Sequence, residues 1–115
     1  MTSKFEYKLL IHSAAQIIQV ADSGQNVAIG KNMRLLPTIQ GNADDGCCLV
    51  IDYKGKFAAI GLNSEIKSAY GDRCEEWYDA TGQSVVPGLV DGHTHTVWAG
   101  DRVHEFAMKS KFFCL

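Results

Sequence analysis

The stretch VVPGLVDGHTHTVWAGDRVHEFAM, residues 85–108, carries the pattern that decides both the fold and the chemistry expected of this chain. It opens with an apolar run that Pro87 and Gly88 interrupt, and it places His93 and His95 two positions apart. Side chains two residues apart lie on the same face of a β-strand. We therefore expect one strand to present both imidazoles together, and paired neutral imidazoles are a common start of a divalent metal site.

The histidine pair is a weak signal alone and gains weight from its neighbours. Gly92 leaves space beside His93, and Asp91 is close enough in sequence to orient a metal-binding histidine. A catalytic zinc normally takes three protein ligands and one water, so two histidines provide only part of a site. Neither His12 nor His104 is expected to complete it, because His12 lies in an apolar patch where a lone histidine is more often packed than metal-bound.

The residue pattern changes its period after the histidines. Val103, Phe106 and Ala107 have the spacing of one helical face, and Asp101 precedes them as a plausible cap. A strand, a glycine-containing loop and a helix form the opening of a βα unit. We expect this helix over residues 101–109.

The preceding residues carry short β-prone runs that turn-forming residues separate. The predicted strands and their turns are a strand, a bend and a strand over 7–20, a hairpin over 49–60, and single strands at 75–80 and 85–86. Short helices are predicted around 32–36 and 63–70. Turns at this spacing favour a small β-sandwich or a barrel-like sheet.

The composition limits the partners of the chain. Its 115 residues suit one small domain, and 11 basic against 13 acidic residues give a formal charge of −2. Without a clustered basic excess we expect neither nucleic acid nor a membrane surface as partner. No secretory signal is visible, so a cytoplasmic location is expected and the four cysteines are predicted to be reduced, mostly buried thiols.

The stretch VVPGLVDGHTH resembles the metal-binding opening of the amidohydrolase superfamily, whose first barrel strand ends in His-x-His. The segments LVIDYKGKFAAIG and EEWYDATGQSVVPG are similar to the β-domain that precedes the barrel in those enzymes. The continuation HTHTVWAGDRVHEFAMK is similar to the imidazolonepropionase family of histidine degradation. The resemblance runs from about residue 7 to residue 109.

The resemblance implies a metal-dependent hydrolysis. His93 and His95 would hold one divalent metal, zinc or iron, and a metal-activated water would open the ring of 4-imidazolone-5-propanoate to give N-formimidoyl-L-glutamate. Arg102 matches the family arginine that binds the propionate carboxylate of this substrate, a role that suits a planar guanidinium. Without the resemblance, Arg102 would be interpreted as a solvated charge at a helix start. Family members are expected to form homo-oligomers.

The predicted fold is mostly β, with a small N-terminal β-sandwich-like domain over 1–86. The first βα unit of a truncated (β/α)8 amidohydrolase barrel follows over 87–109, and residues 110–115 form a divergent tail. A whole barrel takes roughly 250 residues, so we expect an incomplete metal site, assign no catalytic residue and expect this chain to be inactive. Two alternatives stay open: a non-catalytic β-domain module or isoform that associates with a full-length partner, and an amidohydrolase acting on another cyclic amide.

Overall fold

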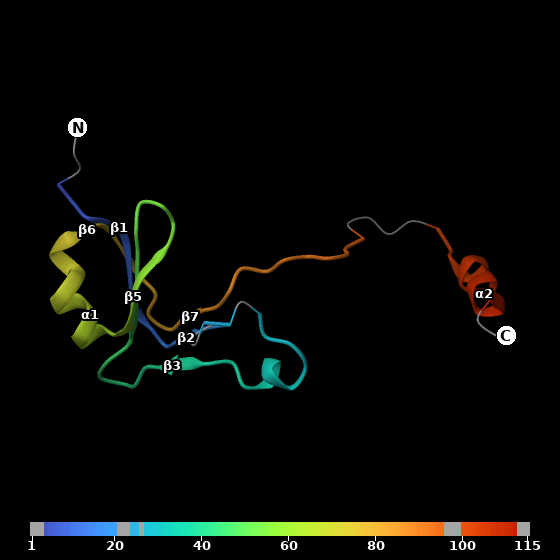
Figure 1. Cartoon of the computed structure of the whole chain (residues 1–115), viewed down its shortest axis with the longest axis horizontal. Helices are drawn as coiled ribbons and strands as arrows, with labels where there is room; N and C mark the ends of the chain where they lie inside the picture. The colour runs from blue at the N-terminus through green and yellow to red at the C-terminus, as the bar shows by residue number, and fades with distance from the viewer. Residues whose placement is uncertain (1–3, 21–23, 26, 96–99, 113–115) are drawn as a thin grey trace.

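A four-stranded sheet forms the larger part of the structure, which is a computed structural model that describes residues 4–20, 24–25, 27–95 and 100–112 (Figure 1). Its central strand β1 (Tyr7–Ala14) pairs antiparallel with β4 (Cys47–Ile51) and parallel with β6 (Cys74–Asp79). The outer strand β5 (Phe57–Leu62) pairs antiparallel with β4, so the order is β5-β4-β1-β6. The apolar run of β4 is buried on both sides, which explains why it reads as continuous rather than alternating.

A second sheet of three short strands continues directly from the first. Its middle strand β2 (Gln16–Ile18) pairs antiparallel with β3 (Thr38–Gln40) and parallel with β7 (Ser84–Val85). Only Ala15 separates β1 from β2, and the chain bends there because Ser13 adopts a left-handed backbone with φ of 62°. The predicted bend between two strands is confirmed.

The core consists of two clusters of buried side chains. One contains Leu10, Cys48, Val50, Ile66 and Cys74. The other contains Ala14, Ile17, Cys47, Leu49 and Ala80, with Ile39 and Val85 packed against it. Successive residues of β4 alternate between the clusters, as the pleat of a strand requires. The second cluster joins side chains of both sheets into one apolar layer.

Three helical elements complete this body, which we define as the described residues of 7–85. Helix α1 (Asn63–Tyr70) buries Ile66 in the first cluster, and a 3-10 turn η2 (Gly71–Arg73) links it to β6. A side chain at Gly71 would place its Cβ 3.1 Å from the Trp77 ring, so the ring would have to shift by a few tenths of an ångström to admit one. A second 3-10 turn, η1 (Gly30–Arg34), lies where a short helix is predicted.

The sequence pattern predicts the body well. The predicted hairpin is β4 and β5, the predicted helix over 63–70 is α1, and the predicted strand over 75–80 is β6. The prediction of a mostly β structure is confirmed, with each sheet containing one parallel pair. Cys47, Cys48 and Cys74 are buried free thiols, as expected, and Cys114 lies outside the described residues.

The remaining described residues, 86–95 and 100–112, are defined here as the arm, and the chain leads away from the body after β7 (Figure 1). Leu89 and Val90 are 99% and 95% exposed, and residues 86–95 pair with no strand in the part of the chain that the structure describes. The strand expected to carry the histidines is therefore absent over 93–95, and its continuation over 96–98 lies outside the described residues. An extended segment becomes a sheet strand only when a neighbour accepts its backbone hydrogen bonds.

Helix α2 (Val103–Phe112) ends the described chain. The Val103 N–H donates to Asp101 Oδ1 at 2.8 Å, so Asp101 caps the helix as the sequence predicts. The helix runs past residue 109 into the predicted divergent tail, of which residues 113–115 lie outside the described part. Within the described residues, no helix combines the length and apolar character that crossing a membrane requires.

Candidate functional site

A turn organised by Asp91 brings the two predicted metal-binding histidines together. The His93 N–H donates to Asp91 Oδ1 at 2.9 Å, and the Thr94 hydroxyl donates to Asp91 Oδ2. Aspartate side chains commonly stabilise a turn by accepting from the backbone two residues ahead. Asp91 therefore acts on the backbone and on a hydroxyl, whereas its sequence position had suggested a bond to an imidazole.

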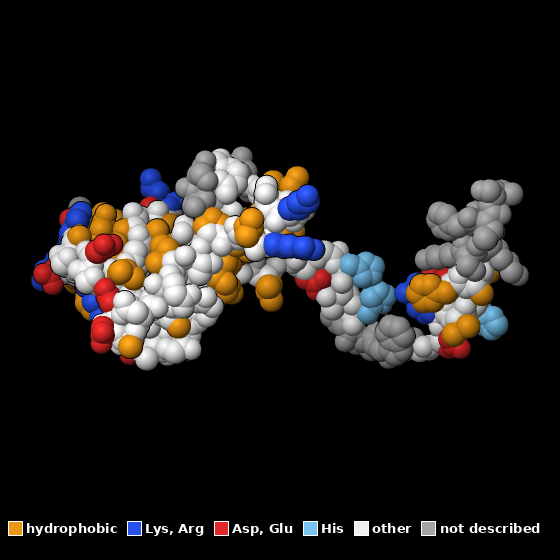
Figure 2. All heavy atoms as spheres, turned by 90° about the horizontal axis from the view of Figure 1, so that it is seen from below, with side chains coloured by type: hydrophobic (Ala, Val, Ile, Leu, Met, Phe, Trp, Pro, Cys, Tyr) orange, Lys and Arg blue, Asp and Glu red, His pale blue; other side chains and the backbone are white. Residues whose placement is uncertain are grey.

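The imidazoles of His93 and His95 converge through equivalent nitrogens. Their Nε2 atoms lie 2.7 Å apart, and the ring centroids are 4.8 Å apart with planes inclined by 33°. That distance is within hydrogen-bonding range, and the tautomers of the two rings decide which Nε2 is the donor. Both residues are exposed, and Figure 2 shows pale blue histidine side chains on the segment that joins the body to α2.

The ligand set is limited to this pair in the described part of the chain. No group of three or more His, Cys, Asp or Glu side chains there is arranged to hold a metal ion. His12 lies in the body, where its Nδ1 is 2.8 Å from Ser13 Oγ and its ring meets the Trp77 ring edge-on at 5.6 Å. Burial lowers the pKa of His12, and the nearby charge of Lys67 lowers it further. His12 is thus a packed residue.

The second predicted site residue, Arg102, lies just before α2. Its Nε is 2.8 Å from Glu105 Oε2 and its Nη2 is 2.6 Å from Glu105 Oε1, which makes a two-point ion pair. The guanidinium also lies 5.3 Å from the centroid of the Phe106 ring. The hydrogen bonds that Arg102 donates to Glu105 raise the pKa of Arg102 above its ordinary value. Sequence reasoning did not single out Glu105, although its position three residues after Arg102 on a helix was the available signal.

The two predicted halves of the site have different side-chain contacts. Arg102 contacts Glu105 and Phe106, whereas His93 and His95 contact each other. The residues between the halves, 96–99, lie outside the described part, including the Trp98-Ala99 portion of the family-like extension. What the geometry provides is a two-nitrogen donor pair and, separately, an arginine held by its own helix.

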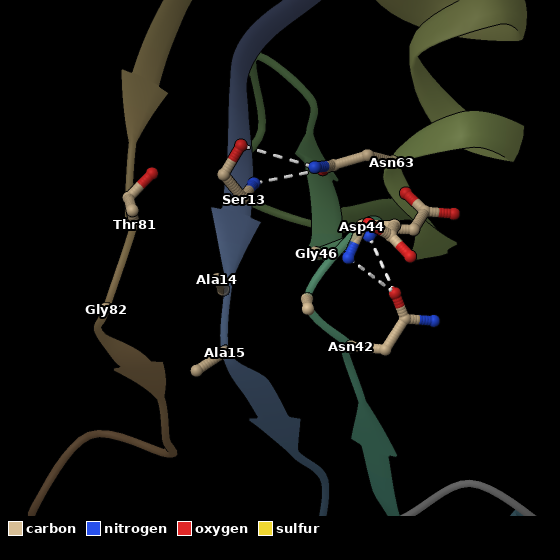
Figure 3. A pocket seen from close by; sticks show the side chains of 11 residues that line it. Ser13, Ala14, Ala15, Asn42, Asp44, Gly46, Asn63, Thr81 and Gly82 are labelled. Carbon is tan, nitrogen blue, oxygen red and sulfur yellow. Dashed lines mark hydrogen bonds between the residues drawn. The ribbon is translucent and has the colours of Figure 1, made fainter.

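A polar hollow of about 360 Å³ lies on the body, between the end of β1, the 41–46 loop and the start of α1 (Figure 3). Asn63 bridges across it, accepting from the Ser13 N–H at 2.9 Å and donating to the Ser13 hydroxyl at 3.2 Å. Asn42 accepts from the backbone N–H groups of Asp44 and Asp45. These polar groups bind one another, so the hollow is a joint that holds the loop, strand and helix together.

An apolar hollow of about 580 Å³ lies where the arm leaves the body. It is lined mainly by apolar side chains, among them Ile17, Leu49, Phe57, Ile60, Val85 and Val86. Phe57 at its margin is 76% exposed. This surface lacks the charged or nucleophilic groups that chemistry would need, and its character is that of a packing face.

Comparison with known proteins identifies relatives of the sequence. No family model matches the chain. It is 41% identical over 103 residues to a protein of Nematostella vectensis named probable imidazolonepropionase, and 43% identical over 106 residues to one of Dictyostelium discoideum with the same name. A human protein of that name is 39% identical over 104 residues. These alignments cover 88%, 91% and 90% of this chain but only 24%, 24% and 23% of the relatives, so the chain spans about a quarter of their length.

Proposed function

Because this chain is a stretch of imidazolonepropionase-family sequence, we propose that it carries the first part of a metal-dependent hydrolase site. The reaction of that site would be the opening of 4-imidazolone-5-propanoate to N-formimidoyl-L-glutamate. The observation that carries the proposal is the convergence of His93 and His95, whose Nε2 atoms lie 2.7 Å apart. A cytoplasmic, homo-oligomeric enzyme belongs to the same proposal, on the ground of family alone.

The two imidazoles suit a metal ion because they are common metal ligands and because their Nε2 atoms point toward each other. Imidazole nitrogen suits both zinc and iron, so the pair does not select between these metals. When bound, such a metal would lower the pKa of a coordinated water toward neutrality and so supply hydroxide. Two nitrogens meet only part of the three-ligand requirement of a catalytic zinc, and the described residues offer no third.

The chain's own part in this site is to orient the two imidazoles. Asp91 holds the turn through the His93 N–H and the Thr94 hydroxyl, and this turn sets where both Nε2 atoms point. For metal binding each ring must keep its proton on Nδ1 and turn an unprotonated Nε2 toward the ion. A neutral imidazole carries one proton in either tautomer, so a ring that donates through Nε2 in the absence of metal would carry this proton on Nδ1 once the metal is bound.

Arg102 would bind the propionate carboxylate of the substrate. Its planar fork of donors matches a carboxylate at two points, and it remains protonated at every relevant pH. We propose no general base, because the two carboxylates beside these groups are already engaged. Asp91 accepts from the His93 N–H and the Thr94 hydroxyl, and Glu105 pairs with Arg102. The 115 residues alone are therefore proposed to be inactive.

A hydrolysis assay with metal analysis on the purified chain tests this proposal. We expect zinc or iron to bind weakly and no turnover of 4-imidazolone-5-propanoate, because two imidazoles hold a metal poorly. His93→Ala and His95→Ala should abolish the weak binding, while His104→Ala, which removes an exposed histidine of α2, should not. Metal binding that survives both substitutions would contradict the proposal, and turnover with stoichiometric metal would contradict the inactivity of the chain.

A second candidate function is a non-catalytic β-module that associates with a full-length partner. The apolar hollow beside Val85 and Val86 and the exposure of Leu89 and Val90 favour it, since such surfaces mark interfaces. Gel filtration and circular dichroism on the chain discriminate between outcomes. A monomeric β-rich fold with cooperative unfolding would support an independent module, whereas aggregation at micromolar concentration would contradict it.

A further inference from the structure

Glu105 occupies one defined edge of the Arg102 guanidinium. Its carboxylate contacts Nε and Nη2, which together form the side edge of the plane. A guanidinium carries five N–H donors in a rigid plane, and this pair uses one on each of these two nitrogens. The end edge, formed by Nη1 and the second hydrogen of Nη2, is a further two-point fork that Glu105 does not use.

Phe106 restrains the same guanidinium in a second direction. The arginine carbon Cζ lies 5.3 Å from the centre of the Phe106 ring, within the range of a cation–π contact. Glu105 thus binds an edge of the group through hydrogen bonds, whereas Phe106 places its ring beneath the guanidinium carbon. Both residues belong to the first turn of α2, so the helix fixes an arginine that itself precedes the helix.

From this geometry we propose that Glu105 is a positioning residue, which holds Arg102 so that its end edge receives the carboxylate of the substrate. The proposal rests on the proposed function, because it assumes that Arg102 is the carboxylate anchor. An unrestrained arginine on the surface populates many rotamers, and binding a ligand must then fix one of them. The contacts from Glu105 and Phe106 fix it before the ligand arrives.

The negative charge of Glu105 repels the carboxylate of the ligand and so opposes the gain from positioning. The sizes of the two effects decide which one dominates. Restraining a rotamer-rich side chain in advance strengthens binding by roughly two- to tenfold. Repulsion between two carboxylates on different edges of one guanidinium weakens binding by about two- to threefold in water, and physiological salt screens part of it. Two-point arginine–carboxylate pairs are also the surface ion pairs whose geometry is best held. Positioning therefore exceeds repulsion, and the expected net effect is about threefold.

The test is a titration of the full 115-residue chain with sodium propionate at physiological ionic strength. Binding is followed through the ¹⁵N and ¹H resonances of the Arg102 side chain by nuclear magnetic resonance. In the wild type, propionate should shift the Nη resonances while the Nε resonance keeps the position set by Glu105. Glu105→Gln should move the Nε resonance in the free protein and weaken propionate binding about threefold.

Matched variants separate positioning from general effects on charge or helix stability. Asp72→Asn removes one exposed carboxylate from η2 in the body and should leave propionate binding unchanged. Phe106→Leu keeps an apolar helix residue but removes the ring face, and should weaken binding by a smaller factor. The backbone amide resonances of α2 report whether the helix is retained, and Glu105→Asp, with a shorter carboxylate, serves if Glu105→Gln unfolds it.

The outcomes distinguish this proposal from the proposed function. Equal propionate affinity in wild type and Glu105→Gln, or tighter binding by the variant, would overturn the role of Glu105 and leave Arg102 as the anchor. Loss of binding in Arg102→Lys with retention in Asp72→Asn would support the anchor itself. An Arg102 whose resonances do not respond to propionate in the wild type would overturn the anchor and the positioning role together.

Discussion

The body and the arm contain similar apolar runs, yet their side chains have opposite environments. In the body, Leu10 and Val50 are fully buried, whereas in the arm Leu89 and Val90 are 99% and 95% exposed. The difference does not lie in the residue types, since all four are aliphatic. It lies in the partners: β1 has strands on both sides, while residues 86–95 have none in the described chain. Burial stabilises the first region, and hydrogen bonds within a few residues shape the second.

The buried core and the residues proposed to bind metal and substrate lie in different regions of the chain. The two buried clusters lie in the body, and the histidine pair and Arg102 lie in the arm. Substitutions should therefore separate cleanly, since those in the body change the free energy of unfolding and those in the arm change binding.

The largest expected effect is a cavity in the body. Leu10→Ala should lower the free energy of unfolding by about 3 kcal/mol, because it removes buried methyl groups that neighbours cannot replace. Leu89→Ala makes the same chemical change at an exposed position and should change stability by less than about 0.5 kcal/mol. Urea unfolding followed by circular dichroism measures the free energy of unfolding of both variants. Similar losses for the two would show that burial does not distinguish these two positions.

A smaller effect, on zinc affinity, is expected when the turn of the arm that orients the imidazoles is disrupted. Asp91→Ala removes the acceptor for the His93 N–H and the Thr94 hydroxyl. Groups that orient metal ligands typically contribute about tenfold or more to metal affinity, so zinc should bind about tenfold more weakly. Calorimetric zinc titration measures this loss, and the urea midpoint should stay that of the wild type. A shifted midpoint with unchanged zinc affinity would show that Asp91 acts on the fold.

The smallest expected effect is the pH dependence that His12 contributes to the body. Its pKa in the folded chain is lowered from the ordinary 6.5 by burial and then by Lys67, while Asp79 opposes the shift. The unfolded chain therefore takes up this proton at a higher pH than the folded chain does. The contribution of His12 is present above pH 6.5 and is lost as the pH falls through the lowered folded value.

His12→Gln should flatten the fall in unfolding free energy between about pH 7 and pH 5. The slope is the informative quantity, because the substitution also removes the edge contact with Trp77. His104→Gln, which changes an exposed histidine of α2, is the matched control and should leave the slope as in the wild type. Equal slopes in all three proteins would show that His12 does not contribute to the pH dependence of stability.

Local patterns were sufficient to predict most of the body. The hairpin of β4 and β5 follows from two β-prone runs around a glycine-containing turn, and α1 follows from a short run that begins at Asn63. The left-handed Ser13 could be anticipated only as a bend, because its conformation depends on Asn63, fifty residues away, which accepts the Ser13 N–H. Contacts of that range leave no periodic trace in the sequence.

The arm shows where such reasoning fails and why. The pattern predicted a strand at His93 and His95, but a strand depends on neighbours that are absent from the described chain, and a turn at Asp91 brings the imidazoles together instead. The prediction that the two rings lie together is thus met by a different local structure. The sequence allowed two interpretations of Arg102, as a carboxylate anchor or as a charge at a helix start. Its ion pair with Glu105 agrees with a charge at a helix start. The pair uses only the Nε and Nη2 edge of the guanidinium, so the proposed carboxylate anchor retains a second edge.

The most direct test of the central claim is a zinc titration that resolves the imidazole resonances of all four histidines in the intact chain. We predict that zinc shifts the signals of His93 and His95 together and leaves those of His12 and His104 in place, with the unfolding midpoint of the body nearly unchanged. Zinc that shifts His12 or His104 to the same extent, or shifts no histidine at all, would contradict the claim that the arm carries the beginning of a metal site.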